Sequence, residues 1–267
     1  MIILFNRFIK GFILGISEGI PGFCSAILAM FLGVYEELLE VISGFYKVKI
    51  LLKNLPFLIG MLLGLITIVI GMAYIINQAE DILKLFFLGL MISGLFNLKK
   101  KVNFKNNEKN WIFLFGILFS ILPEIMPQGS TSNNYLLIII GGLISALGFI
   151  LPGISGSLIL LTMGIYPTII NSLSNVFKIF VKLPMNADLI ISLLFLISFV
   201  LGAIVFSKLI KRFIQKKENM FLKFCMGLIL GSTLIMLIEC YYLSINVFIK
   251  IILIMFGILI MNFFKER

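Results

Sequence analysis

The most informative segment of the chain is Ile20-Pro21-Gly22-Phe23-Cys24-Ser25, because its Pro-Gly pair interrupts an otherwise apolar run. A second stretch, Leu151-Pro152-Gly153-Ile154-Ser155-Gly156-Ser157, repeats the interruption in the other half of the chain. A Gly-x-Tyr triplet follows each Pro-Gly at the same distance, as Gly33-Val34-Tyr35 and Gly164-Ile165-Tyr166. Paired, interrupted apolar segments in the two halves of a membrane protein point to a transport site near the bilayer midplane.

The composition places the chain in a lipid bilayer. Of its 267 residues, 61% are hydrophobic and 13% are charged, and the mean hydropathy is +1.16, so polar groups could not cover a soluble surface of this size. The chain has no histidine, which excludes histidine-dependent phosphatase or hydrolase chemistry and argues against a zinc site. The cysteines lie in apolar segments without metal-type spacing, so we expect no disulfide, metal or cofactor: Cys24, Cys225 and Cys240.

Several apolar runs predict transmembrane helices. A helix needs about 20 residues to cross the hydrocarbon core, and the runs cover residues 55–76, 82–98, 111–126, 189–210, 221–238 and 247–264. Two further segments, 8–39 and 135–172, contain the Pro-Gly breaks, and their limbs are too short to cross. Because proline ends one helix and favours the start of another, we predict two re-entrant hairpins. Two ordinary kinked or tilted spans are the alternative.

The basic residues indicate the orientation. The net charge of +10 comes from lysines and arginines that gather in short loops between apolar runs, which the positive-inside rule explains without nucleic-acid binding. Both termini are then cytoplasmic. Of the 22 basic residues, a few fall on the outer side: Lys84, Lys178, Lys182 and Lys250.

These patterns predict an all-α, polytopic inner-membrane protein with a single transmembrane domain over residues 1–267. Each half holds one re-entrant hairpin and three transmembrane helices, an odd number of crossings, so the halves at about 7–127 and 134–265 form an inverted repeat. Short echoes occur in the same order in both halves, for example Phe87-Leu88-Gly89-Leu90-Met91 and Cys225-Met226-Gly227-Leu228-Ile229.

The two breaks predict an anion site. A helix begins after each Pro-Gly, so its unpaired N–H groups and positive dipole end point into the membrane interior, and small polar residues there suit a phosphate or carboxylate. The alternative is that these residues only permit a kink and close helix packing. The candidate substrate-binding residues are Pro21, Gly22, Cys24 and Ser25 in the first break and Pro152, Gly153, Ser155, Gly156 and Ser157 in the second.

Charged residues near the first break are further candidates. Glu18 stands three residues before Pro21, and a carboxylate inside a membrane is costly and commonly functional. Desolvation favours its protonated form, so Glu18 either couples transport to protons or caps free N–H groups at the break. Arg7 and Lys10 either contact a phosphate head group or anchor the chain at the cytoplasmic surface.

Residues near the predicted interfaces complete the set of candidates. Tyr35 and Tyr166 fit interfacial belt positions as well as a ligand role. Glu124 and Glu239 lie nearer the outer interface, where solvation explains them.

At these motifs the chain resembles the bacterial polyprenyl-phosphate transporter family, the PopT-type undecaprenyl-phosphate translocases. The family pattern has an acid three residues before Pro-Gly, then Ser-Gly-Gly-Thr and Gly-x-Tyr-Glu, and a second copy Pro-Gly-x-Ser-Gly-Ser. The second copy is intact at residues 152–157, and Gly33-Val34-Tyr35-Glu36 also matches. The first copy departs, with Glu18 in place of the usual Asp and Cys24-Ser25-Ala26 in place of Ser-Gly-Gly. The similarity runs from about Gly11 to Glu239.

The resemblance implies a function that the spacing alone does not give. The substrate would be the phosphate of an undecaprenyl-type lipid carrier, returned from the outer to the inner leaflet of the cytoplasmic membrane for cell-wall synthesis. The partners would be this lipid and the bilayer, and a homo-oligomer is compatible with the sequence. A secondary transporter of a small soluble anion is the alternative. A membrane enzyme acting on lipid phosphates would lack the histidine, aspartate-rich metal motif or Ser/Lys dyad that such chemistry uses.

Overall fold

The computed structural model describes residues 2–18, 24–44, 46–104, 110–126, 129, 132–179 and 187–265, and this part of the chain is helical throughout, without strands. The first half contains α1 (Ile2–Glu18), α2 (Ser25–Phe31), α3 (Tyr35–Ser43), α4 (Val48–Lys53), α5 (Leu55–Lys101) and α6 (Trp111–Ile125). The second half contains α7 (Tyr135–Ile150), α8 (Gly156–Thr162), α9 (Tyr166–Ile179), α10 (Ala187–Tyr242) and α11 (Val247–Lys265). The prediction of an all-α protein is confirmed for these residues.

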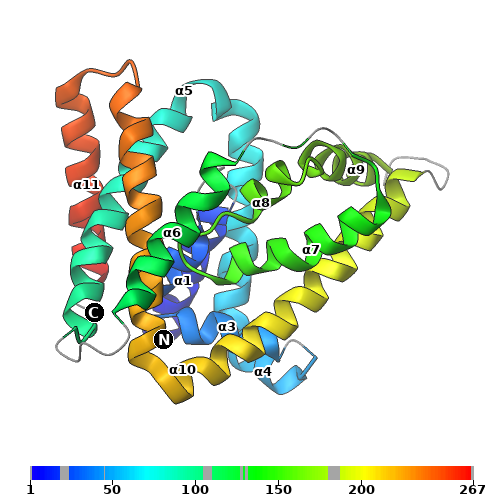
Figure 1. Ribbon diagram of the computed structural model, residues 1–267, viewed down its shortest axis with the longest axis horizontal. Helices are drawn as coiled ribbons and strands as arrows, with labels where there is room; N and C mark the ends of the chain where they lie inside the picture. Colours follow the sequence, from blue (N-terminus) through cyan, green and yellow to red (C-terminus); the bar gives the residue numbers. More distant parts are fainter. Residues whose placement is uncertain are drawn as a thin grey trace.

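Two long helices each contain two of the predicted spans. In α10 the backbone of Lys217 leaves the helical region (φ −147°, ψ 52°), and Figure 1 shows the yellow and orange arms of this helix meeting in a V. The 47-residue helix α5 likewise bends near its middle and comes back along the bundle (Figure 1). The sequence predicted that the chain reverses near residues 77–81 and 211–217; the structure reverses it with bends in place of loops.

Apolar length within the described residues supports a membrane protein. Leu189–Tyr242 is long and apolar enough to cross a membrane, and the shorter apolar helices are Leu55–Thr67, Trp111–Pro123, Tyr135–Ile150 and Val247–Asn262. Gly156–Thr162 and Tyr166–Leu173 are bent by 119° relative to each other, as in a broken span or a re-entrant loop. Helix α8 runs back along α7 from the break between them (Figure 1). Both alternatives that the sequence left open for the second Pro-Gly segment, a re-entrant hairpin or a kinked span, therefore remain compatible with the structure.

Both chain ends lie at the lower end of the molecule in Figure 1, together with α4 and the bend of α10. The last turn of α5, at the same end, carries three lysines, Lys99, Lys100 and Lys101. The bend of α10 adds another basic cluster: Lys211, Arg212, Lys216 and Lys217. The clusters that the sequence assigned to the cytoplasmic side thus share one end of the bundle.

Glycines set the closest helix contacts. A Cβ atom added to Gly11 or Gly15 of α1 would overlap the backbone of α5, and one added to Gly60 or Gly64 of α5 would overlap the backbone of α1. With so little side-chain bulk the two backbones approach closely, which is the usual way that membrane helices associate.

Two further glycine contacts join the halves of the chain. A Cβ atom on Gly89 of α5 would lie 3.1 Å from the Cα of Gly257 in α11, and one on Gly116 of α6 would lie 3.2 Å from the Cα of Gly227 in α10. Each pair takes one helix from the first half and one from the second. This pattern of contacts is the one expected if the two halves are copies of one folding unit and each packs its helices against those of the other.

Candidate functional site

The second Pro-Gly break is held in one conformation by close packing. Gly153 has a φ of +96°, a backbone conformation that favours glycine, and a Cβ atom there would lie 2.6 Å from the backbone carbonyl carbon of Leu228. Ser155, the N-cap residue of α8, has extended backbone (φ −92°, ψ 121°). Its hydroxyl does not cap the helix; the Oγ lies 2.8 Å from the Oγ of Ser157. A Cβ atom on Gly156 would meet the carbonyl oxygen of Ser145 at 2.7 Å.

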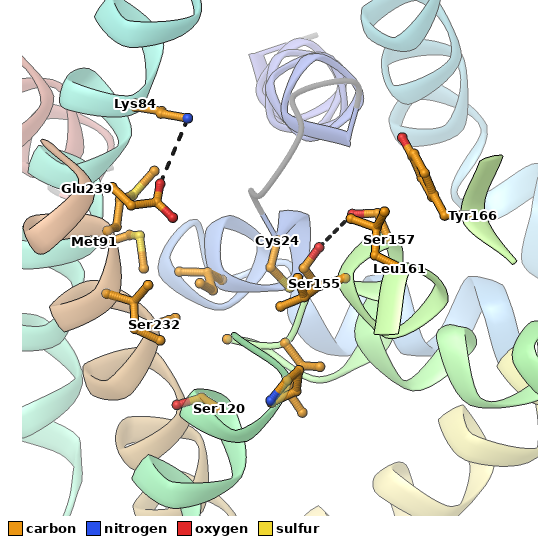
Figure 2. A pocket seen from close by; sticks show the side chains of 17 residues that line it. Cys24, Lys84, Met91, Ser120, Ser155, Ser157, Leu161, Tyr166, Ser232 and Glu239 are labelled. Atoms are coloured by element: carbon orange, nitrogen blue, oxygen red, sulfur yellow. Dashed lines mark hydrogen bonds and ion pairs between the residues drawn. The ribbon is translucent and has the colours of Figure 1, made fainter. Parts of the chain in front are cut away.

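This break forms one wall of a cavity of about 350 Å³. Figure 2 shows the side chains that line it, contributed by α2, α5, α6, α8, α9 and α10. Two of the lining hydroxyls come from helices far away in sequence, Ser120 of α6 and Ser232 of α10. The second break supplies Gly153, Ser155 and Ser157. Most of the remaining lining is apolar, so the polar atoms are few and concentrated.

An ion pair lies at the same cavity. The Nζ of Lys84 in α5 is 3.9 Å from the Oε2 of Glu239 in α10, with 23% and 50% of the two side chains exposed (Figure 2). A pair this long and this exposed contributes about 0–1 kcal/mol to stability. The sequence did not predict this pair: Lys84 was only an exception to the charge pattern, and Glu239 was predicted to be solvated, which agrees with its half-exposed side chain. The exception itself was the signal that could have found Lys84.

The first break is described only in part. Residues 19–23, which include Pro21 and Gly22, lie outside the described residues, as does the side chain of Glu18, the last residue of α1. Cys24 is the N-cap residue of α2, is 7% exposed and reaches the cavity. Ser25 is 2% exposed, and its Oγ has no hydrogen-bond partner among the described residues.

Side chains after the first break hold the end of α7. The Sγ of Cys24 donates to the carbonyl oxygens of Gly148 and Leu151, each at 3.4 Å, and the hydroxyl of Tyr35 donates to the carbonyl of Ile150 at 2.9 Å. The last carbonyls of a helix have no partner within it, so these bonds satisfy the end of α7 where it enters the second break. Tyr35 is 6% exposed and joins the start of α3 to the end of α7, a role that the sequence did not predict.

Arg7 and Lys10 lie away from this cavity. The Nε of Arg7 is 3.4 Å from the Oε1 of Glu37 in α3, and the Nζ of Lys10 donates to the carbonyl of Leu32 at 2.9 Å. Arg7 lines a second cavity of about 300 Å³ with a mixture of acids and bases: Glu36, Glu37, Glu40, Lys53 and Lys211. The structure brings Ser155 and Ser157 to one cavity, with Tyr166, and leaves Arg7 and Lys10 outside it.

Within the described residues no three histidine, cysteine or acidic side chains come together as a metal site, and Cys24, Cys225 and Cys240 are free thiols. The chemistry of the cavity is therefore that of hydroxyls, backbone groups and one ion pair. Hydroxyls and a lysine are groups that can donate hydrogen bonds to an anion.

Apolar helices that break around a polar cavity define a helical membrane protein of the transporter type. The chain belongs to the VCA0040-like family, described as undecaprenyl phosphate translocase-like, whose sequence profile matches residues 14–247.

Two similar proteins are both named polyprenyl-phosphate transporter. The chain is 26% identical over 243 residues to a polyprenyl-phosphate transporter of Vibrio cholerae, covering 85% of this chain and 75% of the relative. It is 27% identical over 240 residues to a polyprenyl-phosphate transporter of Staphylococcus aureus, covering 84% of this chain and 83% of the relative. No solved structure matches the chain.

Proposed function

We propose that the protein translocates a polyprenyl phosphate, with undecaprenyl phosphate as the first candidate, from the outer to the inner leaflet of the cytoplasmic membrane. The observation that carries the proposal is the cavity of about 350 Å³ at the second break, where a few polar side chains gather in an otherwise apolar lining. The family description and the names of both relatives point to the same substrate class. Return of the carrier to the inner leaflet would supply cell-wall polymer synthesis, and the protein would act as a transporter without catalysing a reaction.

The phosphate would bind at the tips of the hairpins. In the second break the hydroxyls of Ser155 and Ser157 line the cavity, while Pro152, Gly153 and Gly156 shape the backbone around them. In the first break Cys24 reaches the same cavity, and Pro21, Gly22 and Ser25 would complete the opposing tip. Hydroxyl and N–H donors at a helix start suit a phosphate that carries close to two negative charges.

The proposed architecture is an inverted repeat of about 7–127 and 134–265, with both termini cytoplasmic. The exchanged pairs Gly89 with Gly257 and Gly116 with Gly227 support it, because two inverted copies of one unit would pack in this reciprocal way. The basic clusters at one end of the bundle support the orientation. Each hairpin would then deliver its tip to the midplane from the opposite side of the membrane.

Lipid flux across liposomes tests the proposal. Purified protein reconstituted with undecaprenyl phosphate should accelerate exchange of the lipid between leaflets, and Ser155→Leu should abolish the acceleration, since it fills the cavity with an apolar side chain. Ser244→Leu, in an exposed loop, is the matched control and should transport normally. Full flux in Ser155→Leu would place the path elsewhere. No flux from folded wild-type protein, together with uptake of a soluble phosphate, would favour a secondary transporter of a small soluble anion.

A further inference from the structure

Lys84 departs from the charge pattern of the chain. It is one of the few basic residues that the sequence places on the outer side, where lysine and arginine are depleted. Its side chain is 23% exposed and lines the cavity at the second break. A lysine that departs from the positive-inside pattern and lines a cavity is a candidate contact for a charged substrate.

Another outer lysine has a structural task. The Nζ of Lys250 donates to the carbonyl oxygens of Cys240 and Tyr241 at 2.8 and 2.9 Å, at the C-terminal end of α10. A cation at this position satisfies free carbonyls and offsets the negative end of the helix dipole. The side chains of Lys178 and Lys182 lie outside the described residues. Within the described part, Lys84 is therefore the outer lysine that lines the cavity.

Glu239 is placed to exchange with an arriving anion. Its Oε2 is 3.9 Å from the Nζ of Lys84, which is longer than the ~2.7–2.9 Å of a strong charge-assisted hydrogen bond. Half of its side chain is exposed, so the carboxylate can turn towards water at little cost. A phosphate monoester offers more negative charge and three acceptor oxygens to the same cation.

We propose that Lys84 binds the phosphate monoester group of the substrate and that Glu239 is the counter-ion that this phosphate replaces. The inference rests on the proposed function and names the cation of its site. Figure 2 shows the ion pair on one side of the cavity and the Ser155–Ser157 hydroxyl pair on the other. The cavity thus offers a phosphate a cation on one wall, at Lys84, and hydroxyl donors on the other, at Ser155 and Ser157.

The exchange would also select the substrate. A free polyprenol has no negative charge and leaves the Lys84–Glu239 pair in place. A phosphorylated lipid replaces one anion with another, so that Lys84 stays compensated whether the site is empty or filled. Lys84 thus discriminates the phosphate from the alcohol, a distinction that an apolar groove for the tail could not make.

Binding of radiolabelled undecaprenyl phosphate to the full-length protein in lipid nanodiscs, measured at several salt concentrations, tests the inference. Lys84→Gln should weaken binding by about tenfold or more, the loss expected for a hydrogen bond to a charged partner, and should flatten the salt dependence. Lys84→Arg should restore most of the affinity. Glu239→Gln should bind at least as tightly as wild type, and Lys250→Gln is the matched control that should bind normally.

The outcomes separate this inference from the proposed function. Wild-type binding and flux in Lys84→Gln, with Ser155→Leu inactive, would overturn the role of Lys84 and leave lipid translocation standing. Weakened binding in Glu239→Gln would overturn the counter-ion exchange. This variant tests the exchange even if Lys84→Gln fails to fold. A parallel arm uses inorganic phosphate. If inorganic phosphate binds in a way that depends on Lys84 and the lipid does not bind, the phosphate site stands and lipid translocation is overturned. If neither inorganic phosphate nor the lipid binds, both the site and lipid translocation are overturned.

Discussion

The helices that follow the two Pro-Gly pairs have the same backbone conformation and differ in what their side chains do. Helices α2 and α8 each have seven residues, and their N-cap residues Cys24 and Ser155 are both extended. The turns that follow also match, with a φ of +69° at Gly33 and +70° at Gly164. The side chains then diverge: Cys24 bonds to the end of α7, whereas Ser155 pairs with Ser157 at the cavity.

The side chains after the two breaks also differ in burial. Ser25 and Ala26 after the first break are 2% and 0% exposed, whereas the corresponding Gly156 and Ser157 after the second are partly exposed. The described residues after the first break are mostly packed, with Cys24 and Ile27 at the cavity, whereas Ser155 and Ser157 after the second break supply hydroxyls to it. The described backbone from the helix start to the Gly-x-Tyr turn is therefore alike in the two copies, and the side chains on it differ in how far they are exposed.

The largest effect should come from adding a methyl group at the second break. Gly153→Ala forces a side chain into a φ of +96° and against the backbone of Leu228, which should cost about 3 kcal/mol or more. Gly33→Ala is the comparison at the first hairpin, where a Cβ atom would meet nothing within 4 Å and the cost should be only the ~1–2 kcal/mol of a left-handed residue. Thermal unfolding in detergent measures both. Equal losses would mean that packing against Leu228 does not hold the break.

A second difference between the tips is the acid that precedes only one of them. Glu18 stands three residues before Pro21, and the matching position in the second half is Phe149. We propose that Glu18 carries the proton if transport is proton-coupled, so that Glu18→Gln should remove the dependence of flux on a pH gradient. Flux measured with and without an imposed gradient checks this. A gradient effect that survives in Glu18→Gln would reduce Glu18 to a capping residue.

The smallest effect on stability should come from loss of the hydrogen bond between Tyr35 and the end of α7. Tyr35→Phe leaves the buried carbonyl of Ile150 without its 2.9 Å hydrogen bond, and should lower stability by about 1–2 kcal/mol. Flux should stay close to wild type because Tyr35 does not line the cavity. The unfolding temperature and the flux of the same preparation give the two numbers. A loss of flux without a loss of stability would show that Tyr35 acts in transport itself.

Local signals in the sequence accounted for the helices, the second break and two of the serines that line the cavity, Ser155 and Ser157. Proline and glycine act on their own neighbours, so the position of the break after Ile150 could be predicted from Pro152 and Gly153. The predicted loops at residues 77–81 and 211–217 contain no proline or glycine, and the chain bends in these regions within α5 and α10. In α10 the backbone of Lys217 leaves the helical region, where polar residues separate two apolar arms.

The remaining wall of the cavity could not be predicted in the same way. Ser120, Ser232 and the Lys84–Glu239 pair come from helices that meet only in the folded bundle, and each residue has an ordinary local explanation. Lys84 alone carried a signal, since it violated the charge pattern. Arg7 was a reasonable candidate for the head group, and the structure pairs it with Glu37 outside this cavity.

Phosphate-selective translocation can be tested with a leaflet-resolved time course of undecaprenyl phosphate in proteoliposomes, with undecaprenol as the uncharged comparison. Protein-dependent movement of the phosphorylated lipid is expected, and none of the alcohol. Movement of both at one rate would contradict selection by a phosphate site, and movement of the phosphorylated lipid no faster than in protein-free liposomes would contradict translocation itself.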